Sequence, residues 1–205
     1  MSKELSSIRV VALLGNESQH RNTLATLIKN GINVVGVCIV DSDRYGIPLS
    51  YILNSIKKRG FLVTISRILA RIIYLLFNSK LDKKLSKEIF NDEENQRIIN
   101  NSNIKQAIAR KFLFQRKFIT QLKPDILIVH TKSWVDKNIR EIESVKYVIG
   151  GHPGITQFYR GAHSSFWAIY NNDFSNIGWT TFIVNHGVDT GPIIEQGFFK
   201  PLEKE

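Results

Sequence analysis

Short apolar runs alternate along this chain with longer stretches whose apolar residues recur at helical spacing. Residues 8–14 and 32–40 are apolar runs rich in β-branched side chains, which are typical of strands buried on both faces of a parallel sheet. Between them, Leu24, Leu27 and Ile28 have the spacing of one helical face. Strand, helix and strand in succession predict a βαβ unit with a right-handed crossover.

Polar residues mark the ends of that helix, and the pattern becomes harder to read after it. Ser18 is an N-cap candidate, and Asn30-Gly31 is a pair that commonly ends helices. Residues 49–100 start with helical spacing and then become polar and charged, which predicts two or three helices and a mobile loop. Residues 103–122 again have helical spacing, and the Lys-Pro-Asp sequence after them stops the predicted helix.

The remaining apolar runs are short and predict further strands. They lie at residues 126–129, 147–149, 179–184 and 192–199. No internal repeat and no low-complexity linker divides the sequence. We therefore predict an α/β fold in one domain spanning residues 1–205, with a helical, basic insertion around residues 50–100.

Composition narrows the class of protein. The chain is 43% hydrophobic and 22% charged, which is ordinary for a soluble globular protein. Its one cysteine, Cys38, excludes an intrachain disulfide framework, fits a reducing compartment and is expected to be a buried structural thiol. The polar start does not have the pattern of a signal peptide, and Arg67 and Arg71 interrupt the longest apolar stretch, residues 61–77. We expect a cytoplasmic protein.

The formal charge of +10 has a local origin. Much of it comes from nine lysines and arginines between residues 57 and 87. Such a stretch could meet nucleic acid, an acidic membrane surface or an anionic small substrate. We favour a solvated helical face, because the stretch has no basic motif interleaved with aromatic residues.

Two polar loops at the ends of predicted strands are candidates for chemistry. His152 stands in the turn Gly150-Gly151-His152-Pro153-Gly154, at the carboxyl edge where open α/β sheets bind ligands. Asp189 lies between Gly187 and Gly191 after another apolar strand, where it is suited to orient a histidine and favour its charged form. Together the loops predict a general acid/base site. An ordinary glycine-rich turn and an Asx turn remain the alternatives.

Several short motifs follow one another in the last third of the chain. They are His-Pro-Gly-Ile-Thr at 152–156, Tyr-Arg-Gly-Ala-His-Ser at 159–164, Phe-Trp-Ala-Ile at 166–169, Gly-Trp-Thr-Thr at 178–181 and Gly-Val-Asp-Thr-Gly-Pro-Ile-Ile at 187–194. This text resembles the catalytic half of the folate-dependent formyltransferases, which include glycinamide ribonucleotide, methionyl-tRNA and nucleotide-sugar N-formyltransferases. The resemblance implies a Rossmann-like, mostly parallel sheet with helices on both faces. It also implies transfer of a formyl group from 10-formyltetrahydrofolate to an amine.

The resemblance assigns roles within a catalytic group. His152 matches the histidine that handles protons at the reacting amine, and Asp189 matches the aspartate that organises that histidine and a water. The third family member, an asparagine whose amide stabilises the oxyanion, is replaced here by Gly150. Loss of one oxyanion donor costs on the order of 10²–10³ in rate. A backbone N–H, a water or another side chain could replace the amide; the chain could be a slow or degenerate enzyme; or the glycine could be a deliberate change. We favour replacement within an active enzyme, because the other features of the loop are retained.

Binding residues are implied by the same resemblance. For the folate they are Lys132, Trp134, Val135, Val188 and Asp189, around a pocket between the strand end near residues 130–135 and the loop before Asp189. For the substrate they are Gly15, Ser18, Arg160, Gly161 and His163, of which the first two open a helix that could receive a phosphate on its N–H groups. Trp167 is expected in the core. Direct transfer requires no metal, and the histidines lack a metal-binding spacing.

The acceptor is expected to be the amine of an amino sugar nucleotide, because the loop at 159–167 looks most like that branch of the family. The ending at Glu205 suggests a minimal chain or a fragment. A formylfolate hydrolase and a catalytically degenerate folate- or nucleotide-binding protein are the alternatives. We expect no membrane partner and no nucleic-acid partner, and leave a homodimer open.

Overall fold

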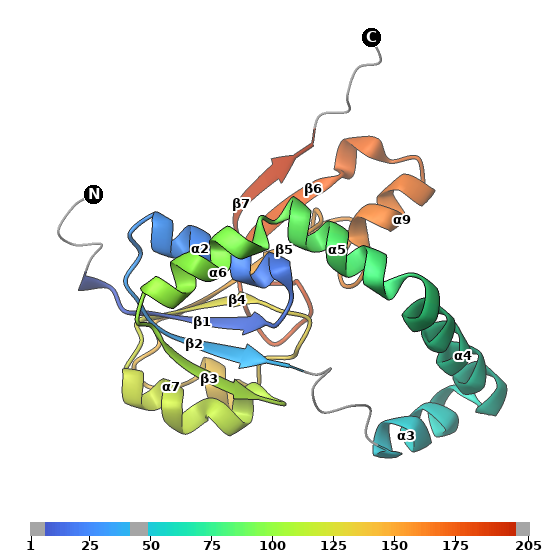
Figure 1. Cartoon of the computed structure of the whole chain (residues 1–205), viewed down its shortest axis with the longest axis horizontal. Coiled ribbons are helices and arrows are strands. Elements are labelled where there is room, and N and C mark those ends of the chain that lie inside the picture. Colours follow the sequence, from blue (N-terminus) through green and yellow to red (C-terminus); the bar gives the residue numbers. More distant parts are fainter. Residues whose placement is uncertain (1–6, 42–48, 200–205) are drawn as a thin grey trace, which may run out of the picture.

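A seven-stranded sheet forms the centre of the molecule (Figure 1). The computed structural model describes residues 7–41 and 49–199. The sheet order is β3-β2-β1-β4-β5-β6-β7. The strands are β1 (Val10–Gly15), β2 (Val34–Val40), β3 (Lys105–Ala109), β4 (Ile126–His130), β5 (Tyr147–His152), β6 (Gly178–Ile183) and β7 (Ile193–Phe198). Strands β1 to β5 are parallel, whereas β6 is antiparallel to β5 and β7 to β6. The predicted α/β class with a mostly parallel sheet is confirmed.

Helices cover both faces of this sheet. They are α2 (Ser18–Lys29), α3 (Leu49–Arg59), α4 (Phe61–Phe77), α5 (Ser79–Ile89), α6 (Asp92–Asn101), α7 (Arg116–Leu122), α8 (Lys137–Arg140) and α9 (Ser164–Tyr170), with short 3₁₀ turns at η1 (Phe112–Gln115) and η2 (Phe174–Asn176). Helices α2 and α6 lie on one face and α7 on the other (Figure 1).

The apolar run of β1 has a direct structural reason. Val11 and Leu13 point into the core beneath η1, α7 and α8, whereas Ala12 and Leu14 point into the core beneath α2 and α6. Because side chains alternate along a strand and both faces are covered, every position has to be apolar. Strands β1 and β2 pair in parallel and α2 lies between them in the chain, which confirms the predicted βαβ unit. Cys38 on β2 is fully buried, and burial raises the pKa of its thiol to about 12, as expected of a structural cysteine.

The predicted helix over residues 103–122 is wrong in its first half. That half is strand β3, followed by η1, and only α7 is helical. Strand β3 pairs with β2 at the edge of the sheet, and its side chains are exposed or half-buried. Because an edge strand buries so little, its sequence Lys-Gln-Ala-Ile-Ala lacks the apolar run that marks the inner strands.

The prediction of two or three helices and a mobile loop for residues 49–100 is also wrong, because four helices, α3 to α6, occupy this stretch. Arg21 on α2 holds α6 in place: its guanidinium donates to both carboxylate oxygens of the buried Asp92. The N-cap of α2 is Glu17 rather than Ser18, which lies one residue inside the helix and is buried. Asn30 and Gly31 end α2 as predicted, with Gly31 at a positive φ of 69°.

Helices α3, α4 and α5 project from the sheet as an arm, which we define as Leu49–Ile89 (Figure 1). Every residue of α4 except Thr64 is exposed to solvent. Within the described residues no single helix has the length and hydropathy to cross a membrane, although α4 and α5 meet that test as a pair bent by 63°.

Candidate functional site

His152 is the last residue of β5, at the position where the parallel half of the sheet meets the antiparallel hairpin. Its side chain is 6% exposed. The Nε2 atom lies 3.0 Å from the carbonyl oxygen of Tyr159 and 2.8 Å from Oγ of Ser164. The Nδ1 atom lies 3.3 Å from Oδ2 of Asp189. The histidine and aspartate that sequence analysis singled out are therefore neighbours in space.

The Asp189 carboxylate is fixed by the backbone on the other side. Its Oδ2 atom accepts a hydrogen bond of 2.8 Å from the amide N–H of Gly161. Asp189 has a positive φ of 51°, in the left-handed region that aspartate tolerates better than most residues. The loop between β6 and β7 thus turns sharply enough to bring this carboxylate back to the end of β5.

The atoms around the imidazole of His152 are all able to accept hydrogen bonds. Ser164 donates its hydroxyl proton to the carbonyl of Gly161, so its Oγ is left to accept from Nε2 of His152. The Tyr159 carbonyl is also an acceptor, and Nδ1 faces a carboxylate. Both ring nitrogens of His152 therefore face oxygen atoms that can accept a hydrogen bond.

Thr180 connects the histidine loop to the hairpin. This fully buried residue of β6 donates from its hydroxyl to the Gly154 carbonyl at 2.7 Å. The same oxygen accepts from the backbone N–H of Thr156 at 3.2 Å and from Nε2 of Gln196 on β7 at 2.9 Å. One hydroxyl therefore holds both sides of the turn after His152 against β6 and β7.

Gly150 lies on the same face of β5 as His152, because side chains alternate along a strand. A Cβ atom built there would lie 2.9 Å from Cγ2 of Val184 and 3.1 Å from Cζ of Phe182. Real Cβ atoms do not approach that closely without movement of the neighbour. Phe182 and Val184 thus occupy the space that a side chain at position 150 would need.

A cleft of about 450 Å³ lies beside this group. Residues at the ends of three neighbouring strands line it: His130 from β4, Gly150 to His152 from β5, and Trp179 to Thr181 from β6, with Thr23 from α2. The volume falls in the range of small-molecule sites. The cleft therefore reaches from the His152 turn to His130, which forms a pair with another histidine.

That second pair is His20 on α2 and His130 at the end of β4, whose rings meet edge to face at 4.8 Å. Nδ1 of His130 lies 2.7 Å from Oγ1 of Thr23, and Nδ1 of His20 accepts from the backbone N–H of Glu17 at 3.2 Å. Burial lowers the pKa of His20 to about 4, with repulsion from His130 acting in the same direction. Burial also lowers the pKa of His130, so both rings are held neutral near pH 7.

The residues expected to bind folate are spread over two environments. Val135 is 5% exposed within the main core, so its side chain is not available to a ligand. Trp134 and Val188 are exposed at 53% and 55%. Lys132 forms an ion pair of 2.8 Å with Glu17. Burial alone would raise the pKa of Glu17, but the hydrogen bond and charge of Lys132 outweigh it and lower that pKa overall.

The residues expected to bind the acceptor lie in two places. Gly161 and Arg160 belong to the loop over His152, where Arg160 donates from Nε to the Thr156 carbonyl at 2.6 Å. His163 is exposed at the start of α9 with a positive φ of 62°. Gly15 and Ser18 are at the end of β1 and the start of α2, and β4 lies between β1 and β5 in the sheet.

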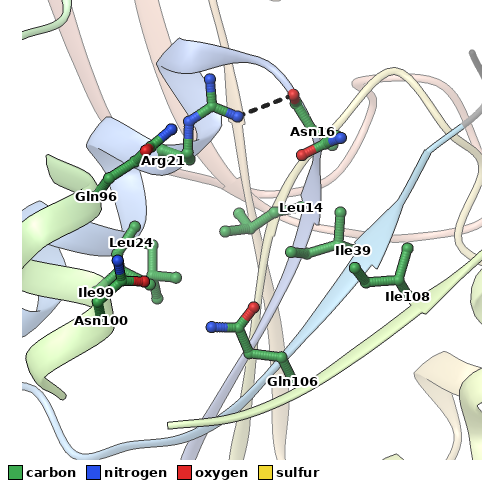
Figure 2. A pocket seen from close by; sticks show the side chains of 11 residues that line it. Leu14, Asn16, Arg21, Leu24, Ile39, Gln96, Ile99, Asn100, Gln106 and Ile108 are labelled. Atoms are coloured by element: carbon green, nitrogen blue, oxygen red, sulfur yellow. Dashed lines mark hydrogen bonds between the residues drawn. The ribbon is translucent and has the colours of Figure 1, made fainter. Parts of the chain in front are cut away.

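Gly15 lines a second hollow of about 250 Å³, shown in Figure 2. Amide side chains of Gln96, Asn100 and Gln106 surround it, and Arg21 donates from Nη1 to the Asn16 carbonyl at 3.1 Å at its rim. Ser18 is buried, and its hydroxyl accepts a hydrogen bond from Arg21. It does not line this hollow. Gly15 itself is needed for packing, because a Cβ there would lie 2.5 Å from the ring of His20.

Sequence reasoning missed part of the site. Ser164 and Thr180 belong to the motifs of the last third of the chain, but no role was predicted for either. Nothing in their local sequence indicates that Ser164 bonds to His152 and Thr180 to the turn after it. Trp167, expected in the core, is 48% exposed and packs edge to face on Phe166 and Tyr170. Among residues 7–41 and 49–199, no three or more His, Cys, Asp or Glu side chains are placed to hold a metal ion.

Comparison with known proteins identifies the fold. The sequence of this chain matches no family model and no curated protein. Among solved structures, the chain is similar to phosphoribosylglycinamide formyltransferase from Anaplasma phagocytophilum (12% identity, TM-score 0.58, covering 96% of this chain and 75% of that one). It is similar to the same enzyme from Bacillus halodurans (14% identity, TM-score 0.57, 96% and 82%).

A third similar structure is a formyltetrahydrofolate deformylase from Pseudomonas syringae pv. tomato, with 14% identity and a TM-score of 0.55. The alignment covers 94% of this chain and 51% of that one. At these identities the likeness concerns the fold, and the fold expected from the sequence motifs is confirmed.

Proposed function

We propose that this chain transfers a formyl group from 10-formyltetrahydrofolate to a primary amine. The observation that carries the proposal is the approach of His152 Nδ1 to Asp189 Oδ2, at 3.3 Å, on the rim of a cleft at the carboxyl edge of the sheet. The same fold in formyltransferases and in a formyltetrahydrofolate deformylase supports a formylfolate as the donor.

In this reaction the amine nitrogen attacks the formyl carbon, and the carbonyl oxygen becomes the oxyanion of a tetrahedral intermediate. The carbon–nitrogen bond to the folate then breaks, with its electron pair returning to the folate nitrogen, and the amine loses a proton. A positively charged imidazole at 152 stabilises the oxyanion and supplies the proton that the folate nitrogen needs. The Asp189 carboxylate favours that charge and can take up the proton of the amine, directly or through water.

This role requires a small movement at His152. Its Nε2–H is directed at Tyr159 and Ser164, so the bond has to turn from these acceptors toward the substrate for proton transfer. Tyr159 lies in the loop that also carries Arg160 and Gly161, the residues we propose to contact the acceptor. We therefore expect acceptor binding to shift this loop and release the ring, which couples the chemistry to the presence of the amine.

The oxyanion is stabilised without an amide at position 150. The apolar side chains of Phe182 and Val184 fill the space beside Gly150. They occupy the place that an asparagine side chain would need, and neither offers a hydrogen-bond donor. The donors we propose in place of the amide are the imidazole of His152 and a bound water or a backbone N–H near the end of β5, since Gly150 and Gly151 are themselves paired within the sheet. We propose that these suffice for a slower enzyme, since one missing donor costs on the order of 10²–10³ in rate.

The acceptor class we propose is an amino sugar nucleotide. The motif text at 159–167 supports it, as do the exposed Arg160 and His163 in the loop between β5 and α9, which can face an anionic acceptor. The proposed folate contacts are the exposed Trp134 and Val188, with backbone groups near Val135.

The test is to incubate the purified chain with 10-formyltetrahydrofolate and a panel of amines: 4-amino sugar nucleotides, phosphoribosylglycinamide and buffer alone. Formylated product and free formate are measured by mass spectrometry and a formate assay. His152→Ala should lower product formation by about 10²–10⁴. His186→Ala, at an exposed histidine of the β6–β7 loop, should leave it unchanged. Equal rates in the wild type and His152→Ala would refute the proposed chemistry.

Hydrolysis of the formylfolate is the second candidate, favoured by the deformylase among the similar structures. Water would take the place of the amine at the same His152–Asp189 pair. Formate release that is independent of every added amine would identify this reaction, whereas formate release that falls as product rises would identify transfer. Binding of the folate without either product would indicate a degenerate enzyme.

A further inference from the structure

The arm carries a large apolar surface that the rest of the described molecule leaves uncovered. Helix α4 has seventeen residues, of which only Thr64 is buried. Its exposed apolar side chains include a row seven residues apart, Leu62, Leu69 and Leu76, with exposed fractions of 81%, 53% and 70%. Figure 1 shows α4 projecting well beyond the sheet. Contiguous apolar surface of this kind marks a binding face in a folded protein.

The polar side of α4 is the side that is already occupied. Thr64, Arg67, Arg71 and Tyr74 recur every three or four residues and form one narrow polar stripe, outside which α4 has one polar residue, Ser66, whose hydroxyl donates to the Val63 carbonyl. Thr64 lies 3.1 Å from Ser55 of α3 through their hydroxyl oxygens, and Tyr74 donates to Asp82 of α5 at 2.6 Å. Helices α3 and α5 thus contact the stripe, and the wide apolar arc centred on Leu69 faces away from these contacts.

Charge indicates what covers this arc. From Leu49 to Lys80 the sequence has no acidic residue and six cations: Lys57, Lys58, Arg59, Arg67, Arg71 and Lys80. The next helix, α5, adds Lys83, Lys84 and Lys87 beside an exposed apolar row of Leu81, Leu85 and Ile89. A protein partner that matched this arm would need both an apolar groove and a strongly acidic rim. A bilayer containing anionic lipids provides an apolar layer under a negative surface over any area.

We propose that the arm docks on an anionic membrane surface, with α4 lying in the plane of the headgroups and its leucine row inserted among the acyl chains. Lysines and arginines of α3 and α5 then contact lipid phosphates, while their aliphatic stems remain in the interface. The sheet and its cleft are held at the membrane without insertion. This proposal replaces our expectation of no membrane partner, and is independent of the reaction proposed for the His152 cleft.

Co-sedimentation with lipid vesicles tests the proposal on the full chain. The wild type should bind vesicles of phosphatidylcholine mixed with phosphatidylglycerol, and bind pure phosphatidylcholine much less. Leu62→Glu/Leu69→Glu/Leu76→Glu should lower binding to the anionic vesicles by more than about 100-fold. Lys80→Gln/Lys83→Gln/Lys87→Gln should lower it on the order of 100-fold and weaken the preference for anionic lipid, since three of the nine cations are removed.

Phe114→Glu is the matched control, because Phe114 is as exposed as Leu76 (69% against 70%) but lies on η1, outside the arm. It should bind vesicles like the wild type, and circular dichroism should show that every variant keeps its helix content. Equal binding to both vesicle types, or binding that the leucine variant retains, would overturn the proposal. So would a dimer in analytical ultracentrifugation that Leu69→Glu dissociates while vesicles bind neither form, since the arc would then belong to a second copy of the chain.

Discussion

Single hydrogen-bonding groups position the two residues of the proposed reaction. Asp189 is held by the Gly161 N–H, His152 by Tyr159 and Ser164, and the turn between them by Thr180. The sequence predicted His152 and Asp189 because each follows an apolar strand. It could not predict Ser164 or Thr180, since a hydroxyl that bonds to a distant turn has the same local sequence as one that faces solvent. The motif showed that Gly150 stands where the resembling family has an asparagine. It could not show that Phe182 and Val184 lie beside this glycine in the folded chain.

Gly150→Asn tests whether the missing amide can be restored. The new side chain would collide with Val184 and Phe182, so we expect a loss of about 1–3 kcal/mol in the free energy of unfolding and no gain in formyl transfer. Gly151→Ala is the matched control, because a Cβ at that position meets nothing within 4 Å. Urea unfolding of both variants gives the comparison. A Gly150→Asn protein as stable as the wild type and faster in transfer would show that the space is available.

Thr180→Val removes one oxygen and leaves the side-chain shape nearly unchanged. The Gly154 carbonyl and the Thr156 N–H would each lose their hydrogen bond to this buried hydroxyl. We expect a loss of about 2–4 kcal/mol in the free energy of unfolding, because buried polar groups without partners are costly. Thermal unfolding followed by circular dichroism measures it. Thr181→Val, one residue further along β6 and only half-buried, should change stability much less.

At the scale of elements, the sequence pattern predicted the inner strands β1 and β2 but not the edge strand β3. β1 and β2 are apolar at nearly every position because cores lie on both their faces, so composition alone marks them as strands. β3 was read as helix because it pairs on one side only and leaves Lys105 and Gln106 exposed. Residues 49–100 were predicted to hold a mobile loop as well as helices, whereas helices fill them. Helix α6 is held by the ion pair of its Asp92 with Arg21 of α2, a contact that the local pattern does not contain.

The first turn of α2 should make the stability of the fold depend on pH. The pKa of His20 is about 4 in the folded chain and 6.5 when exposed, so between these values the unfolded chain binds a proton that the folded chain does not. Stability is therefore complete above about pH 6.5 and falls as pH decreases toward 4. From pH 7.5 to 5 we expect His20 to account for a loss of about 2 kcal/mol.

Urea unfolding at these two pH values, in the wild type and in His20→Asn, measures the effect. Asparagine can still accept the hydrogen bond from the Glu17 N–H but does not titrate, so its loss between pH 7.5 and 5 should be smaller by that amount. His186→Asn, at an exposed histidine, should follow the wild type. Identical pH dependence of all three proteins would mean that His20 is not held neutral.

At the scale of the whole molecule, charge and chemistry are separated. The arm has nine lysines and arginines against two acidic residues, a net charge of +7 out of +10 for the chain. The sheet and its remaining helices therefore carry little net charge. The basic stretch is helical and exposed, in keeping with the solvated face that we favoured, but the exposed side chains of α4 are mostly apolar. No pattern within the stretch indicated that it leaves the body of the protein.

The reversal of strand direction after β5 has a consequence for biosynthesis. His152 comes from the last parallel strand, whereas Asp189 arrives only with the turn between β6 and β7. A nascent polypeptide can pair its first five strands as they leave the ribosome and still have an imidazole with no carboxylate beside it. The His152–Asp189 pair on which the proposed reaction depends is then complete only when the β6–β7 hairpin closes onto β5, and a translation product that stops short of this turn would lack the carboxylate.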